Sequence, residues 1–131
     1  MLLVLISLTV IMFLPLMLAI GSIRFRVIQF GKPDIENPRA QSADLSGAGQ
    51  RIVSAQHNAW EALALYVTAL TLCALSGLSL DAIVYPSLLF VCARFSHAIF
   101  YIAGIGSMRF VSFITSLGAL GWILILAFNA I

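Results

Sequence analysis

Apolar residues fill four long stretches of this chain, and most polar residues gather between the first and second stretches. Each stretch is about as long as the roughly 20 residues that a helix needs to cross the hydrocarbon core of a bilayer. The pattern predicts transmembrane helices at about 2–25, 51–75, 81–103 and 108–128, with a polar loop at about 29–50. We therefore expect an all-α membrane protein, a four-transmembrane-helix bundle that forms one domain over residues 1–131.

Composition supports a membrane protein and excludes several other classes. Hydrophobic residues make up 62% of the chain and charged residues 9%, whereas soluble domains carry about 25% charged residues. The net charge of +2 is too small to indicate a nucleic-acid partner. Cys73 and Cys92 both lie in apolar segments, and their spacing fits neither a disulfide framework nor a metal site. We interpret both as small buried hydrophobic residues and predict no metal.

Basic residues indicate how the chain sits in its membrane. Arg24 and Arg26 follow the first apolar segment instead of preceding it, so this segment is expected to be a retained helix with interfacial arginine anchors, not a signal peptide. Five basic residues lie in or beside the first loop, namely Arg24, Arg26, Lys32, Arg39 and Arg51. Arg109 lies beside the third loop, and the second loop has no Lys or Arg. The positive-inside rule then places loops one and three in the cytoplasm and both termini outside. The short loops favour a bacterial inner membrane.

Several polar residues lie within the second predicted helix. Arg51, Ser54, Asn58 and Glu61 are spaced by three, four and three residues, so they share one helix face. Glu61 lies about 15 Å along the helix from Arg51. Ionisable residues at such depth are costly in lipid and usually mark a functional site.

The third predicted helix carries a matching set. Arg94 lies about 14 Å from the end of its helix, level with Glu61 on the antiparallel neighbour, and we expect a buried ion pair between them. His97 and Tyr101 continue the same face. Together these residues predict a polar groove that opens to the cytoplasmic side, lined by Arg51, Asn58, Glu61, Arg94, His97 and Tyr101. The Glu61–Arg94 pair alone is also compatible with a purely structural contact between membrane helices.

In these polar residues the chain resembles the MAPEG family, the membrane-associated proteins in eicosanoid and glutathione metabolism. One block resembles the family signature of the second helix and comprises Arg51, Ala55, Gln56, Asn58 and Glu61. A second block resembles the signature of the third helix and comprises Arg94, His97 and Tyr101. Asn37-Pro38-Arg39, which we expect to form a turn, is similar to a loop motif common in bacterial members.

The resemblance implies a homotrimer of four-helix subunits, with three sites at subunit interfaces that face the cytoplasm. Family enzymes use glutathione as a co-substrate. They add its thiol to lipophilic electrophiles, reduce lipid hydroperoxides, or isomerise a lipid endoperoxide. The implied partners are a second and third copy of the chain, membrane lipid and a lipophilic small molecule.

The resemblance also implies roles for individual residues. Asn58 and Glu61 would hold the polar ends of glutathione, Arg94 would brace Glu61, and Tyr101 would line the same site. Arg51 and His97 belong to the same groove.

The resemblance implies that two further residues act across the subunit boundary, and three other positions depart from the family pattern. By resemblance, Gln56 would reach a neighbour's site, and Arg109 would stabilise the glutathione thiolate from the adjacent subunit, where a guanidinium favours the reactive anion. Ser54 replaces a second arginine of many glutathione-using relatives, and Ala62 and Ile114 replace tyrosines. One lost charge-assisted hydrogen bond is worth about 1.5–3 kcal/mol, which corresponds to roughly ten- to hundredfold weaker binding of glutathione.

Three functions follow from this reading. The first is a glutathione-dependent transferase or peroxidase acting on lipophilic electrophiles. The second is a non-catalytic lipid-binding or scaffold protein of the same fold, which the departures favour. The third is a small proton-coupled exporter, although such exporters carry an unpaired carboxylate in the first helix and this helix has none.

Overall fold

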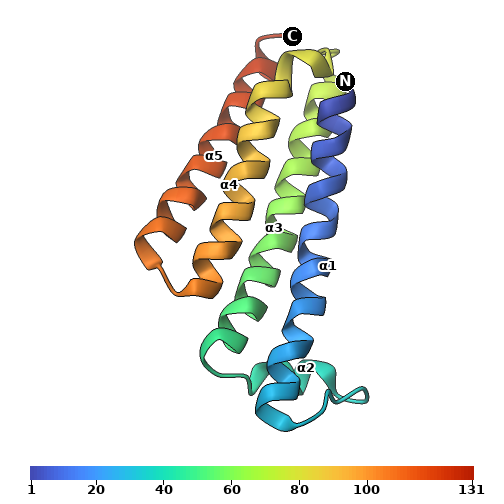
Figure 1. Cartoon of the computed structure of the whole chain (residues 1–131). Helices are drawn as coiled ribbons and strands as arrows, with labels where there is room; N and C mark the ends of the chain where they lie inside the picture. The colour runs from blue at the N-terminus through green and yellow to red at the C-terminus, as the bar shows by residue number, and fades with distance from the viewer.

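Four long helices lie side by side and run antiparallel to their neighbours in the chain (Figure 1). A computed structural model describes all 131 residues. The helices are α1 (Leu2–Phe30), α3 (Gly47–Leu75), α4 (Val84–Ala103) and α5 (Gly106–Phe128), and a short 3₁₀ turn, η1 (Leu80–Ile83), leads into α4. The prediction of an all-α four-helix membrane bundle is confirmed, because four helical segments are long and apolar enough to span a bilayer.

The first two long helices extend further than predicted. Helix α1 continues to Phe30 and ends at Gly31, which adopts a left-handed conformation with φ of 81° and donates its backbone N–H to Val27 O. Glycine takes this conformation without the steric cost that a Cβ atom imposes. Helix α3 begins at Gly47, four residues before the predicted start. Both differences have the same reason: residues outside the membrane can continue a helix, so the apolar pattern alone does not mark its end.

The polar loop contains a helix that the sequence did not predict. Helix α2 spans Pro38–Ala43, and Asn37 occupies the position just before it. The prediction of a turn at Asn37-Pro38-Arg39 is therefore wrong. Proline is favoured at the first position of a helix because its fixed φ suits the helix and its missing N–H needs no partner there.

Small residues let α3 approach its neighbours closely. The buried face of α3 carries Ala55, Ala59, Ala62, Ala69 and Cys73. Helix α1 packs mainly against α3, and α4 packs mainly against α5. Small side chains at such contacts are typical of membrane helices, whose association depends on close packing.

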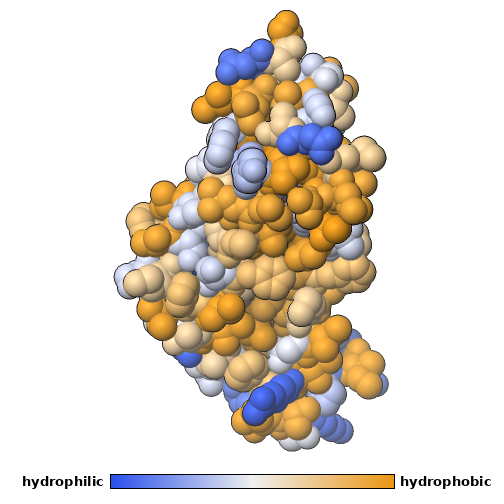
Figure 2. Space-filling model, turned by 45° about the horizontal axis from the view of Figure 1, so that its top comes forward, coloured by the Kyte–Doolittle hydropathy of each residue, from blue (hydrophilic) through white to orange (hydrophobic).

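Large apolar side chains cover the outside of the bundle. Leu2 is 70% exposed and Ile20 is 69% exposed, and Figure 2 shows a mostly hydrophobic face with strongly hydrophilic residues only toward its upper and lower parts. Cys73 is buried as expected, but Cys92 is exposed on this apolar surface, so its interpretation as a buried residue is wrong. Exposed apolar surface of this extent requires lipid or another protein to cover it.

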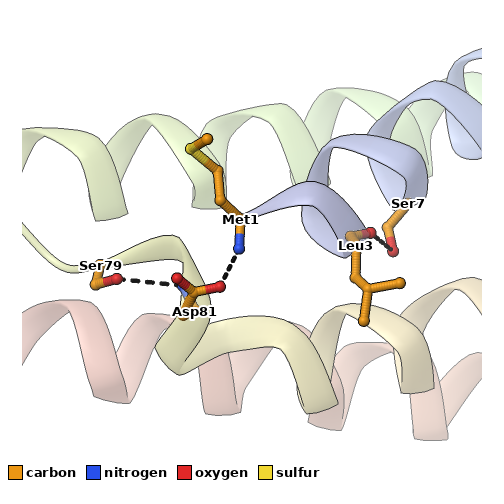
Figure 3. A network of polar contacts seen from close by, with 5 residues as sticks. All are labelled: Met1, Leu3, Ser7, Ser79 and Asp81. Carbon is orange, nitrogen blue, oxygen red and sulfur yellow. Dashed lines mark hydrogen bonds and ion pairs between the residues drawn. The ribbon is translucent and has the colours of Figure 1, made fainter.

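The two ends of the bundle differ. At one end α1 and α3 project beyond the α4–α5 turn and carry α2 (Figure 1). At the other end, where both termini lie, the Met1 amine forms an ion pair with the Asp81 carboxylate, and the Asp81 N–H donates to Ser79 Oγ at 3.3 Å (Figure 3). These contacts join the start of α1 to η1.

Candidate functional site

Arg94 is buried between α3, α4 and α5. Only 3% of its surface is exposed. Its Nη2 donates to Asn58 O at 3.0 Å and also to the side-chain Oδ1 of Asn58, and its Nη1 approaches Ser116 Oγ at 3.4 Å. A buried guanidinium is tolerated in a membrane bundle only when such acceptors surround it, so Asn58 is its main partner.

The expected ion pair between Glu61 and Arg94 does not form. Asn58 lies between them, because its Nδ2 donates to Glu61 Oε2 at 3.2 Å while its Oδ1 accepts from Arg94. The only ion pair in the chain is the one between Met1 and Asp81. Helical rise placed Glu61 and Arg94 at one level, and both line the same hollow. Glu61 points in a different direction around the α3 axis from Asn58, which leaves Glu61 exposed on the surface of the bundle.

This region forms a hollow of about 120 Å³, which we call the deep hollow. Its polar wall consists of Asn58, Glu61, Arg94 and Ser116. Its other walls are apolar and come from Ala62, Leu65, Phe90, Phe113, Leu117 and Leu120. The deep hollow therefore combines an exposed carboxylate with a surface that suits a lipophilic molecule.

A second hollow lies at the end of α4 and the start of α5, and we call it the loop-end hollow. It has a volume of about 180 Å³, and its polar lining comprises Arg51, Tyr101 and Arg109. Arg51 Nε donates to Ile102 O at 2.9 Å. The guanidinium carbon of Arg109 lies 4.5 Å from the centre of the Tyr101 ring, a cation–π distance. Two cations held in this way make the loop-end hollow attractive to anions.

Gly104 lies beside one of these cations. It has φ of +77°, and a Cβ atom built on it would lie 3.4 Å from the guanidinium carbon of Arg51. That distance is an ordinary van der Waals contact, so it is the positive φ of the turn after α4 that requires glycine here.

His97 separates the two hollows and lines neither of them. It is 4% exposed, and its ring lies 5.5 Å from the Tyr101 ring and 6.1 Å from the Phe113 ring. The predicted continuous groove is thus divided. The structure brings Asn58, Glu61 and Arg94 together in one part, and Arg51 with Tyr101 and Arg109 in the other.

Gln56 lies elsewhere, in a third hollow of about 280 Å³ between α1, α2 and α3, which we call the α2 cavity. The lining of the α2 cavity consists of Arg26, Pro38, Arg39, Ser42, Ala43, Val53, Gln56 and His57. Arg26 is more than an interfacial anchor, because it is half-buried and its Nη2 donates to Ser42 Oγ at 2.7 Å. Gln56 and Asn58 therefore belong to different flanks of α3.

Between these flanks runs a row of residues that we call the α3 stripe. Its members repeat at alternating intervals of three and four, and all but the first are exposed: Ser54, His57, Glu61, Ala64, Thr68 and Thr71. A repeat averaging 3.5 residues is the spacing by which helices pack lengthwise against each other. Polar and small residues here contrast with the large apolar residues that cover the rest of the bundle.

Residues from α5 complete the deep hollow, and we did not single them out from the sequence. Ser116 contacts Arg94, and Phe113 forms a wall beside His97. A signal was present, because Ser112, Ser116 and Ala119 form a buried row of small residues at helical spacing. Such a row in a membrane helix marks the face that meets a neighbouring helix.

Comparison with known proteins identifies the family. The sequence model of the MAPEG family matches residues 1–129 of the chain. No curated protein and no solved structure gives a significant match. The matched region includes all four spans and every hollow described above. This chain, an integral multi-pass membrane protein, therefore belongs to the MAPEG family.

Proposed function

We propose that this protein is a glutathione-dependent transferase or peroxidase that acts on lipophilic electrophiles. The observation that carries the proposal is the crevice between α3 and α5, where an exposed Glu61 carboxylate and an apolar wall lie close to the cationic loop-end hollow. Glutathione offers an ammonium group, two carboxylates and a thiol. Its charges therefore match a crevice that combines one carboxylate with separate guanidinium groups.

Each group of glutathione has a matching residue. Glu61 accepts hydrogen bonds from the ammonium group, and its contact with Asn58 orients it for this role. Arg51 binds a carboxylate by charge-assisted hydrogen bonds. Arg109 favours the thiolate over the thiol, because a positive charge stabilises the anion.

The chemistry follows from this placement. The thiol gives its proton to water, and the sulfur anion forms a bond to an electrophilic carbon of the second substrate. With an activated alkene, the displaced electron pair moves to the activating group and a proton from water completes the addition. Leu65, Phe90 and Leu117 provide the surface for the apolar part of that substrate.

One subunit is too small to hold glutathione alone. The deep hollow and the loop-end hollow measure about 120 and 180 Å³, whereas ligand sites usually exceed about 300 Å³. The α3 stripe explains how the site is completed. Glu61 and His57 are costly against lipid, so this stripe packs against another copy of the chain, and we propose a homotrimer.

The flanks of α3 then meet across the subunit boundary. Asn58 lies on one side of the α3 stripe and Gln56 on the other. In a closed ring of copies, each subunit presents one flank to the next subunit's opposite flank. Gln56 of one copy thereby approaches the deep hollow of its neighbour.

We further propose that α2 and the α4–α5 turn lie in the cytoplasm of a bacterium, with the protein in the inner membrane. Arg24, Arg26, Lys32, Arg39 and Arg51 lie near this end of the bundle. The segment between α3 and η1, at the other end, has no Lys or Arg. Glutathione would then enter from the compartment in which thiols stay reduced.

Calorimetry on the purified protein in detergent tests the proposal. Wild-type protein should bind glutathione, and Glu61→Gln and Arg109→Ala should each weaken binding about tenfold or more, the value of one charged hydrogen bond. Arg24→Gln is the matched control, since this exposed arginine lines none of the three hollows. Absence of binding heat in the wild type would refute the proposal.

A lipid-binding or scaffold protein is the second candidate, and Ser54 favours it. The Ser54 hydroxyl donates to Gln50 O at 3.0 Å within its own helix, so it replaces none of the charge of the family arginine. This candidate predicts a lipophile in the α3–α5 crevice and no turnover of thiol. Mass spectrometry of the purified protein detects such a lipophile directly.

A further inference from the structure

We propose that the segment between α1 and α2 lies on the lipid surface and inserts the side chain of Ile35 into the headgroup layer. This segment comprises residues 31–37, and we call it the α1–α2 loop. The proposal does not depend on glutathione use, because no residue of the α1–α2 loop lines the deep hollow, the loop-end hollow or the α2 cavity.

Ile35 is the large apolar side chain that the α1–α2 loop presents to its surroundings. It is 88% exposed, more than Ile20 on the membrane-spanning part of α1. Phe30, at the end of α1, is also exposed, and it lines the same hollow as Ile35. The two side chains therefore belong to one apolar patch, which lipid or another protein must cover.

Hydrogen bonds fix the shape of the α1–α2 loop around Ile35. On one side, the Asp34 N–H donates to Gln41 Oε1 of α2 at 2.8 Å. On the other side, the Asp34 carboxylate accepts the backbone N–H groups of Glu36 and Asn37, each at 2.9 Å. The backbone before and after Ile35 is thus held in place, so the exposure of Ile35 is built into the loop.

The same contacts place the α1–α2 loop at the level of the headgroups. With Leu2 at one edge of the hydrocarbon core, Arg26 lies about 36 Å away along α1 at 1.5 Å per residue. The core is about 30 Å thick, and the headgroup layers extend the bilayer to about 40–45 Å. Arg26 therefore lies in a headgroup layer. Ser42 accepts from Arg26 at 2.7 Å, and Gln41, the residue before Ser42, accepts from Asp34, so two hydrogen bonds tie the loop to this level.

The path of the α1–α2 loop agrees with this depth. In Figure 1 the loop extends sideways past α1, on the side away from α4 and α5, and it does not reach beyond the end of α1. Met17 and Ile20 are exposed on the membrane-spanning part of α1, which indicates that lipid borders this helix. A loop that points sideways at the headgroup level therefore lies over that lipid.

Charged residues keep the α1–α2 loop at the surface of the membrane. Lys32, Asp34 and Glu36 line the same hollow as Ile35, and such charges are costly in the hydrocarbon core. The apolar stem of Lys32 suits the lipid side while its ammonium group stays in water. An apolar tip bordered by charges is typical of a segment that lies in the interface. The loop thereby sets how far this end of the bundle stands out of the membrane.

Spin-label accessibility of the full-length protein in phosphatidylcholine nanodiscs tests the inference. Ile35→Cys, in a background with Cys73→Ala and Cys92→Ala, carries a single nitroxide label. Electron paramagnetic resonance measures how often the label collides with oxygen, which concentrates in lipid, and with a water-soluble nickel chelate. We expect the oxygen-to-nickel ratio to be several-fold higher for Ile35→Cys than for Glu36→Cys, the next exposed position of the same loop.

A lipid-facing reference makes the outcome decisive. Ile20→Cys, at an exposed apolar position of α1, gives the ratio for full contact with lipid. A ratio for Ile35→Cys between those of Ile20→Cys and Glu36→Cys supports the proposal, because the headgroup layer lies between hydrocarbon and water. A ratio equal to that of Glu36→Cys would overturn it. Rare collisions with both reagents would show that protein covers Ile35, which would overturn it as well.

A second variant tests whether Ile35 holds the α1–α2 loop against the membrane. With the label moved to Phe30→Cys, the further change Ile35→Asp should lower the oxygen-to-nickel ratio several-fold, because a carboxylate is costly against lipid. Ile35→Leu should leave the ratio unchanged. Equal ratios for both variants would contradict the anchoring role. Since none of these measurements uses glutathione, absence of glutathione binding would refute the proposed enzyme activity and leave this proposal standing.

Discussion

Asn58 is the residue whose replacement tests the geometry of the deep hollow most sharply. Its side chain accepts from Arg94 and donates to Glu61, so one amide joins two charged groups. Asn58→Leu removes both contacts while the backbone carbonyl of residue 58 still accepts from Arg94 at 3.0 Å. The buried guanidinium then keeps only that carbonyl and the distant Ser116 hydroxyl.

The size of the effect can be worked out from these partners. A hydrogen bond to a charged group contributes about 1.5–3 kcal/mol, and measured bonds between membrane helices reach about 1.7 kcal/mol. Arg94 is 3% exposed and cannot turn to solvent, so we expect Asn58→Leu to lower the free energy of unfolding by about 2 kcal/mol. Arg94→Met, which leaves the side-chain Oδ1 of Asn58 without its donor, should cost about 1–2 kcal/mol for the same reason.

The double variant distinguishes a specific contact from general disruption. Asn58→Leu with Arg94→Met leaves no buried guanidinium without acceptors, and the lost contact with Glu61 is common to the single Asn58→Leu variant and the double variant. Replacing buried polar partners together by apolar residues is often nearly neutral. We expect its cost to stay under about 1 kcal/mol, which gives a coupling energy of about 2 kcal/mol. Reversible unfolding in mixed micelles measures all three values. Additive losses within about 0.5 kcal/mol would refute the reasoning. Thr9→Val is the neutral control, because the Thr9 hydroxyl is exposed and bonds only to Leu5 O of its own helix.

Three further predictions concern the glycines, the cation–π contact and the buried tyrosine. Gly104→Ala should lower stability by about 1–2 kcal/mol, since alanine is strained at φ of +77°. Gly118→Ala has nothing within 4 Å of its new Cβ and should be neutral or stabilising in thermal unfolding. Tyr101→Leu removes the ring beneath Arg109 and should weaken glutathione binding in calorimetry by about 0.5–1 kcal/mol, while Tyr101→Phe keeps the ring and should bind like the wild type; equal loss in both would contradict a cation–π role. Tyr66→Phe should leave stability unchanged or raise it, because the Tyr66 hydroxyl is buried without a partner; a loss above about 1 kcal/mol in the same unfolding assay would reveal a hydrogen bond to it.

Depth along the helices was predictable, and direction around them was not. The rise per residue placed Glu61 level with Arg94, and both indeed line the deep hollow. Each residue advances the direction of the side chain around the helix axis by about 100°, so three residues advance it by about 300°. Asn58 and Glu61 therefore point about 60° apart. That rotation decides that Asn58 meets Arg94, and only the packed arrangement of α3 and α4 reveals which of the two residues faces inward.

Loop residues were predictable as polar but not as structure. The composition of the first loop gave no helical periodicity over six residues, so α2 was missed. Arg26 looked like an anchor because the sequence could not reveal that Ser42, 16 residues later, folds back to accept from it. Contacts of this kind depend on the path of the loop in space, which local preferences do not determine.

Cross-linking along the α3 stripe tests the central claim most directly, namely that Glu61 lies where two copies of the chain meet. Thr68→Cys, in a background with Cys73→Ala and Cys92→Ala, places one thiol on the exposed stripe two turns beyond Glu61. Oxidation in native membranes should yield disulfide-linked dimers. Leu89→Cys, at an exposed apolar position on α4, should stay monomeric. Linked dimers from Leu89→Cys with none from Thr68→Cys would place the stripe against lipid and leave the proposed glutathione site without its second wall.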